Sequence, residues 1–309
     1  MITAIQLLGG VLMLYIGAEF LVRGAAALAL RVGISALVVG LTVISFGTSA
    51  PELVVSFDAA MKYDSAIALG NVVGSNIANI ALVLGLAAII KPLHVELQVI
   101  RREAPLMLVI TLLLCAMLWN GELAQWEGGL LFAAIIAYAV FSVYWSRKTG
   151  RDDDASVRSL NKQRWWLSAL SVVIGLVLLL PGAHLFLMGA VTVAERMGLS
   201  TFVIGLTVVA IGTSLPEIAA SVVAAFRGEG DLAIGNAIGS NVFNILFILG
   251  ITALVFGIDA SVISMLDFAV MVEVAAISLP IMRTGFVISR WEGALLVAGY
   301  ATYIVYQLN

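Results

Sequence analysis

The chain has 309 residues, of which 62% are hydrophobic and 11% are charged, and its formal net charge is −3. A soluble domain carries about 25% charged residues, so this chain has too little polar surface to cover a water-exposed globule. Apolar runs of transmembrane length recur throughout it, and the apolar–polar alternation of strands is absent. These features predict an all-α integral membrane protein and disfavour a β-barrel.

Ten apolar segments follow one another along the chain, and only one long polar stretch, residues 147–164, interrupts them. The segments are 3–22, 35–61, 66–90, 104–119, 127–146, 166–190, 200–226, 232–256, 261–282 and 286–307. We therefore expect ten transmembrane helices. Residues 1–146 form a first five-helix unit, 147–164 a linker and 165–309 a second unit.

Two blocks of the sequence occur twice, at one constant interval of 165 residues. Residues 40–56 recur as 205–221, and residues 69–85 recur as 234–250. Two matches at one interval indicate a duplicated unit, whose repeated helix pairs lie at about 37–90 and 202–255. Because each unit holds five helices, an odd number, the second unit enters the membrane from the opposite side. The sequence therefore predicts an inverted repeat, which is typical of alternating-access transporters.

Basic residues collect on one side of this arrangement. With residues 147–164 in the cytoplasm, only Lys62 and Arg196 of the sixteen Lys and Arg residues fall on the opposite side. Cytoplasmic loops of membrane proteins carry such an excess of basic residues. We therefore expect a cytoplasmic linker and both termini outside the cytoplasm. The short loops favour a bacterial inner membrane, with the lipid bilayer as the surrounding partner.

The second helix contains the motif G-T-S-x-P-E, Gly47–Glu52. Pro51 has no backbone donor and clashes with the carbonyl of Gly47, so we expect the helix to break and carbonyls near Ser45 and Thr48 to turn inward. A charged Glu52 at this depth costs about 2.5–3.5 kcal/mol, which marks a functional residue. The seventh helix repeats the motif as Gly212–Glu217.

The partner helices add further oxygen atoms. Ser75 and Asn79 lie four residues apart and so share a helix face, and Ser240 and Asn244 repeat the pair. We expect Glu52 and Glu217 to face each other at mid-membrane among these groups. Two close carboxylates require a proton or a cation between them. A site of oxygen ligands with two negative charges suits Ca²⁺ and also accommodates Na⁺. The absence of nearby His or Cys argues against soft metals.

At these residues the sequence resembles the calcium/cation antiporter superfamily and, within it, the prokaryotic sodium/calcium exchanger family. The matching motifs are Gly47–Glu52 with Gly74–Asn79, and Gly212–Glu217 with Gly239–Asn244. The resemblance implies a ten-helix antiporter that exports Ca²⁺ in exchange for Na⁺ by alternating access. It also implies that the first and sixth helices slide to gate the site.

The resemblance assigns roles to individual residues. The Ca²⁺ ligands are Glu52, Glu217 and the backbone oxygens of Thr48 and Thr213. The flanking Na⁺ sites are formed by Ser49, Ser75, Ser214, Ser240 and the carbonyls of Ser45 and Ala210. Asn79 and Asn244 form the central polar pair. Some family members carry Asp at one position of that pair, whereas this chain has Asn at both. The site has one formal negative charge fewer, which leaves the coupling ion and its number open.

Other functions compete with Na⁺/Ca²⁺ exchange. A Ca²⁺/H⁺ antiporter is the closest alternative, because two buried glutamates also accept protons. Broken helices in inverted halves favour a closed central site over a channel, and no nucleophile with a matching base points to an enzyme. We expect no cofactor beyond the transported ions Ca²⁺ and Na⁺, no nucleic acid and no obligate protein partner. Glu273, within the ninth helix, has no assigned partner.

Overall fold

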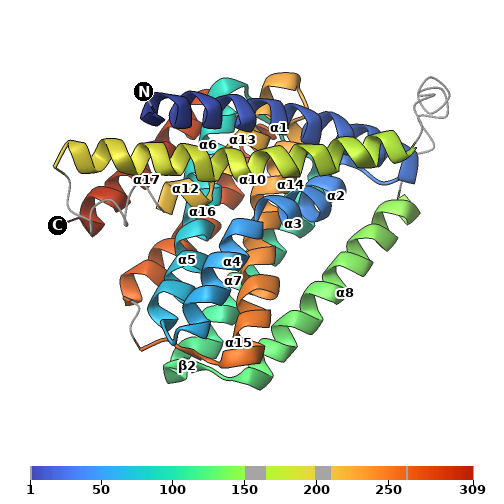
Figure 1. Ribbon diagram of the computed structural model, residues 1–309. Helices are drawn as coiled ribbons and strands as arrows, with labels where there is room; N and C mark the ends of the chain where they lie inside the picture. The colour runs from blue at the N-terminus through green and yellow to red at the C-terminus, as the bar shows by residue number, and fades with distance from the viewer. Residues whose placement is uncertain (1, 150–164, 199–209, 262–263, 309) are drawn as a thin grey trace.

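The computed structural model describes residues 2–149, 165–198, 210–261 and 264–308, which are almost entirely helical (Figure 1). The helices of the first half are α1 Ile2–Val32, α2 Ala36–Val39, α3 Ser45–Thr48, α4 Ala50–Met61, α5 Ser65–Ala78, α6 Gly85–Ile90, α7 Ala104–Met117 and α8 Gln125–Thr149. Those of the second half are α10 Trp165–Arg196, α12 Ala210–Thr213, α13 Leu215–Arg227, α14 Gly230–Phe243, α15 Gly250–Phe256, α16 Met265–Arg283 and α17 Arg290–Gln307.

Short π-helical and 3-10 turns complete several of these helices. They are η1 Gly40–Ile44, η2 Asn79–Leu84, η3 Val99–Glu103, η4 Leu118–Asn120 and η7 Asn244–Leu249. Within the described residues, seven continuous helices are long and apolar enough to span a membrane, and a bent pair, Ala36–Thr48 with Ala50–Met61, forms an eighth span. The segment that contains α12 and α13 and the less apolar α17 bring the number to the ten that the sequence predicts.

The helices α1 and α10 are unusually long, with 31 and 32 residues. A bilayer core of about 30 Å needs only about 20 residues, so helices of this length cross it at a tilt. The sequence segments 3–22 and 166–190 were therefore too short as predictions, because the apolar and small residues continue each helix to Val32 and Arg196. In Figure 1 the two helices lie side by side across the remaining bundle.

Glycines at seven-residue intervals form the contact between these two antiparallel helices. The glycines are Gly10, Gly17 and Gly24 on α1, and Gly175, Gly182 and Gly189 on α10. At Gly17, an added Cβ lies 2.9 Å from the carbonyl oxygen of Gly175 and 2.9 Å from the backbone nitrogen of Leu179. Only glycine permits backbones to approach so closely. The result is a close contact between the backbones of the two helices.

The two halves are joined by pairs of short antiparallel strands. Strand β1, Leu93–His94, pairs with β4, Val287–Ile288, and strand β2, Glu122–Leu123, pairs with β3, Ile258–Asp259. Each pair takes one strand from each half. The same kind of strand pair therefore occurs twice between the halves, as an inverted repeat with a pseudo-twofold axis predicts.

The centre of the bundle is formed by the two helices that carry the repeated asparagines. In the apolar 18-residue stretches of Ser65–Ile90 and Gly230–Phe256, 72% and 78% of the residues are buried, compared with 33% and 28% in those of α1 and α10. Close backbone contact brings the halves together there, because Gly40 lies against Gly235. The first residues of the predicted linker, 147–149, continue α8. Residues 150–164 lie outside the described residues, so the cytoplasmic placement of the linker stays a prediction.

We expect Gly17→Ala to lower the melting temperature of the purified protein. The new Cβ meets backbone atoms at 2.9 Å, and overpacking of this kind costs about 1–3 kcal/mol. Gly299→Ala is the matched control, because nothing described lies within 4 Å of its Cβ and alanine favours a helix by about 0.5–1 kcal/mol. Equal melting temperatures for the two variants contradict the close contact.

Candidate cation-binding site

A broken helix places each glutamate. The segments Ala36–Thr48 and Ala50–Met61 meet at an angle of 47°, and Ser49 lies at the break. Pro51 lies in the first turn of α4, where its missing N–H is tolerated. The second copy breaks at Ser214, with Pro216 in the first turn of α13. The predicted breaks are confirmed in both halves.

The two glutamates are deeply buried and belong to one cluster. Glu52 and Glu217 lie in the first turns of α4 and α13, and each is 1% exposed. Ser49 Oγ donates a hydrogen bond of 3.1 Å to Glu217 Oε1, so a residue of the first half contacts the glutamate of the second. The two carboxylates also repel each other electrostatically. The first turn of a helix favours a negative charge, which partly offsets that repulsion.

Each glutamate-bearing helix packs against a helix with a polar stripe. Ser75 and Asn79 come from α5 and its π-helical continuation, and Ser240 and Asn244 come from α14 and its continuation. All four are buried, with at most 4% exposed. A π-helical turn begins at each asparagine, Asn79–Leu84 and Asn244–Leu249. Such turns occur frequently at functional sites.

Several oxygen atoms of this cluster are buried without a hydrogen-bond partner in the described part of the chain. They are Glu52 Oε2, Asn79 Oδ1, Ser214 Oγ, Glu217 Oε2, Ser240 Oγ and Asn244 Oδ1. An unsatisfied buried acceptor costs about 1–3 kcal/mol. Carboxylate, amide and hydroxyl oxygens are the ligands of hard cations such as Ca²⁺. The chemistry of these donors therefore fits a hard cation and no soft metal.

A neighbouring asparagine orients Asn244, one member of the central pair. Asn244 Nδ2 donates to Asn76 Oδ1 at 3.2 Å, so the carbonyl oxygen Asn244 Oδ1 is left without a partner. Asn241 Nδ2 donates to the backbone oxygen of Asn76 at 3.1 Å. Because an amide has one oxygen and two donors, committing the NH₂ group to Asn76 reserves the oxygen for another ligand.

The remaining predicted ligands differ in their surroundings. Thr48 and Thr213 are buried beside the two breaks, and Thr48 Oγ1 donates to the carbonyl of Ile44 at 3.1 Å. The carbonyl of Ser45, which the proline was expected to free, accepts a hydrogen bond from Ser49 N at 3.0 Å. The proline removes only the donor four residues after Gly47, so that expectation was wrong for Ser45.

The Ser45 side chain also has bonds of its own. Its Oγ contacts the carbonyls of Gly40 at 2.7 Å and Asn236 at 3.1 Å, so the side chain is already hydrogen-bonded within the protein. Ala210, its counterpart in the second half, is the first residue of α12. Its surroundings lie outside the described residues, so its role stays a prediction.

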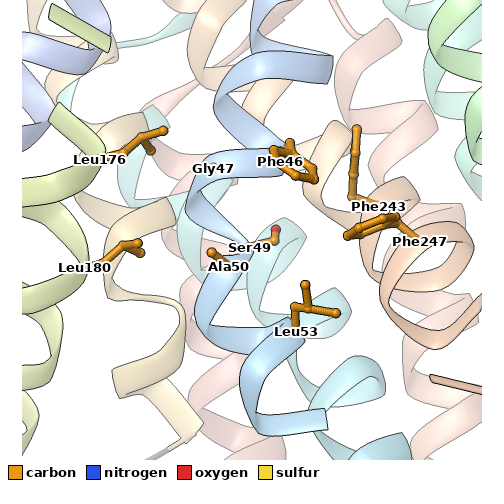
Figure 2. A pocket seen from close by; sticks show the side chains of 9 residues that line it. All are labelled: Phe46, Gly47, Ser49, Ala50, Leu53, Leu176, Leu180, Phe243 and Phe247. Atoms are coloured by element: carbon orange, nitrogen blue, oxygen red, sulfur yellow. The ribbon is translucent and has the colours of Figure 1, made fainter. Parts of the chain in front are cut away.

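An apolar cavity of about 200 Å³ adjoins Ser49 (Figure 2). It is lined by Phe46, Gly47, Ser49, Ala50, Leu53, Leu176, Leu180, Phe243 and Phe247. Leu176 and Leu180 belong to α10, and Ser49 supplies a hydroxyl within an otherwise apolar lining. The cavity therefore lies between the break in the second helix and one of the two long tilted helices.

Acidic residues outside the cluster have other roles. Glu19 forms an ion pair with Arg23 at 2.6 Å and another with Arg227. Asp267 accepts a hydrogen bond from Tyr303 at 2.8 Å. Glu273 is exposed on the outer face of α16. Within the described residues, no three His, Cys, Asp or Glu side chains form a group that holds a metal, so the cluster relies on two carboxylates and neutral oxygens.

Sequence reasoning missed the asparagines Asn71 and Asn236. Both contact the backbone of a site glutamate, at 3.1 Å from Glu52 O and 3.3 Å from Glu217 O. The signal was present, because both lie within the repeated blocks and four residues before Ser75 or Ser240. The four-residue spacing that joins Ser75 to Asn79 and Ser240 to Asn244 also places Asn71 and Asn236 on the same helix faces.

The fold and this donor set define a helical integral membrane protein whose two halves together bury a cluster of hard oxygen donors. The family model for the sodium/calcium exchanger protein matches twice, over residues 2–144 and 167–309. The chain therefore belongs to the sodium/calcium exchanger family, whose members are cation antiporters and not enzymes.

Individual relatives match along almost the whole chain. CaxA of Alkalimonas amylolytica is 38% identical over 98% of each chain. The sodium/calcium exchanger MaX1 of Methanosarcina acetivorans is 33% identical, with 97% of this chain and 96% of that protein covered. A solved structure of the sodium-calcium exchanger NCX_Mj superposes with a TM-score of 0.85 at 32% identity over 98% of each chain. These matches confirm the predicted family and the exchanger fold.

We expect Glu52→Gln and Glu217→Gln each to raise the melting temperature of the purified protein in a chelating, ion-free buffer. Each variant removes one of two repelling buried charges, and the expected gain is about 1–3 kcal/mol. Added Ca²⁺ should stabilise the wild type and neither variant. Glu273→Gln is the control, because that exposed side chain lies outside the cluster. A lower melting temperature for both site variants in ion-free buffer contradicts the charge repulsion.

Proposed function

We propose that this protein exports Ca²⁺ in exchange for Na⁺ by alternating access at the cluster around Glu52 and Glu217. The observation that carries the proposal is the set of unpartnered buried oxygens, which comes from both halves and includes one carboxylate from each. The names of MaX1 and NCX_Mj describe sodium/calcium exchangers, which supports the same pair of ions here.

Charge explains why exchange is coupled. One Ca²⁺ neutralises both carboxylates, and Na⁺ ions compete for the same oxygens. Without an ion, the cluster holds two negative charges. Enclosing these charges in a low-dielectric region costs free energy, so the empty site is not closed off from water. The site therefore changes sides only when loaded, and loading by one ion excludes the other. Antiport follows from this competition.

The close contact between α1 and α10 supports the movement that alternating access requires. Glycine backbones meet along the contact, so the two helices are held together and can shift along the bundle as one pair. Leu176 and Leu180 of α10 line the cavity beside Ser49. A shift of α10 alters that cavity and so opens or closes one route to the cluster.

A proton-coupled exchanger of Ca²⁺ or another divalent cation is the second candidate. The observation that favours it is the central pair Asn79 and Asn244, which adds no negative charge. Two protons on Glu52 and Glu217 neutralise the site as fully as one Ca²⁺ does.

The membrane we propose is a bacterial inner membrane, because the relative YrbG of Escherichia coli, 35% identical, is named an inner membrane protein.

The transport test uses purified protein in liposomes loaded with Na⁺ and diluted into Na⁺-free buffer that contains Ca²⁺. We expect Ca²⁺ uptake by the wild type. The uptake rate should fall at least about 100-fold for Glu52→Gln and for Glu217→Gln, because a metal site that loses one of its ligands loses much of its affinity for the metal. Glu273→Gln should retain uptake. Uptake that needs an outward H⁺ gradient instead of Na⁺ establishes the second candidate, and no uptake under either gradient rejects both.

A further inference from the structure

We propose that Asn71 and Asn236 are positioning residues that hold the two site glutamates in register with the ligand helices. The inference deepens the proposed function and rests on the cation site around Glu52 and Glu217. Each asparagine comes from the ligand helix and binds the backbone, not the carboxylate, of the glutamate in its own half. The carboxylate oxygens therefore stay available to the ion.

The contacts are the same in both halves. Asn71 Nδ2 donates to the backbone oxygen of Glu52 at 3.1 Å and to Ser56 Oγ at 2.9 Å. Ser56 Oγ in turn donates to the carbonyl of Ala68 on the asparagine's own helix, at 3.3 Å. The side chains thus connect two consecutive turns of α4 to α5. This fixes both the rotation and the height of the glutamate-bearing helix.

The second half repeats the connection. Asn236 Nδ2 donates to the backbone oxygen of Glu217 at 3.3 Å and to Ser221 Oγ at 2.9 Å. Asn236 and Ser221 are 1% and 0% exposed, so water does not compete for these bonds. Both connections lie just beyond a proline break, where the intrahelical hydrogen bonds that normally set the helix position are fewer.

The position of each asparagine on its helix explains its effect on the site. Asn236, Ser240 and Asn244 follow one another at four-residue intervals and so lie on one face of the ligand helix. The first residue binds the glutamate's backbone, and Ser240 Oγ and Asn244 Oδ1 are unpartnered oxygens. Since the helix rises about 1.5 Å per residue, the bond at Asn236 determines which of these oxygens lie level with the Glu217 carboxylate.

Asn236 also connects the two halves. Its Oδ1 accepts a hydrogen bond of 3.1 Å from Thr48 Oγ1, at the break of the first half. Its backbone oxygen accepts a second bond, from Ser45 Oγ at 3.1 Å. Asn71 is only half-buried. Loss of the Asn236 side chain therefore disturbs the glutamate of one half and the broken helix of the other.

The test measures Ca²⁺ uptake by Na⁺-loaded liposomes over a range of Ca²⁺ concentrations. Asn236→Ala should raise the half-saturating Ca²⁺ concentration by about tenfold or more, the usual effect of losing a group that orients a ligand. Asn71→Ala should raise it less. Ser278→Ala is the control, because it removes one buried hydrogen bond, to the carbonyl of Ala275 at 2.7 Å, outside the repeated helices.

A second readout separates positioning from general stability. In ion-free buffer, Asn236→Ala and Ser278→Ala should melt at similar temperatures, whereas Ca²⁺ should stabilise Asn236→Ala much less at a given concentration. If Asn236→Ala does not fold, Ser221→Ala removes one of the two bonds of this connection, that from Asn236 to Ser221, and should raise the half-saturating Ca²⁺ concentration by a smaller factor.

The outcomes distinguish this inference from the proposed function. Wild-type uptake together with an unchanged half-saturating concentration for Asn236→Ala, or for Ser221→Ala in its place, overturns the positioning role alone. A lower maximal rate without a change in that concentration overturns it as well. An absence of Ca²⁺ uptake by the wild type under a Na⁺ gradient rejects the proposed function, and the positioning role with it.

Discussion

Two carboxylates share one buried region of this membrane protein, and their mutual repulsion is the constraint on which the rest of the structure depends. Glu52 and Glu217 are each 1% exposed, and in the described part of the chain neither forms an ion pair. Such a pair is stable in lipid only with a proton or a cation. The neighbouring neutral oxygens supply coordination without adding a compensating charge. We therefore propose that the transported ions supply the positive charge.

The architecture meets this constraint twice with the same parts. A proline break begins a new helix at each glutamate, whose first turn favours negative charge. A partner helix presents serine and asparagine oxygens, and its π-helical turn begins at the asparagine. Duplication and inversion then bring the two copies together with opposite directions through the membrane. Neither half holds both carboxylates, so a complete site requires both halves.

The sequence was sufficient for the parts that depend on composition and repetition. The constant interval of 165 residues predicts the two halves, and Gly47–Glu52 predicts the break at Ser49. The ends of α1 and α10 were not predicted, because small residues such as Gly24 carry no clear signal for a helix end. The bond from Asn236 to the Glu217 backbone was missed for a similar reason. Helical spacing shows which residues share a face, but not how far one helix is shifted along another.

The most direct test of the account is the number of Ca²⁺ ions that the purified protein binds at equilibrium, in the absence of Na⁺ and of any gradient. The account predicts one tight site in the wild type and its loss in both Glu52→Gln and Glu217→Gln, because each half supplies one carboxylate to a shared ion. Tight Ca²⁺ binding that survives in either single variant shows that the carboxylates act independently. That result contradicts the shared site.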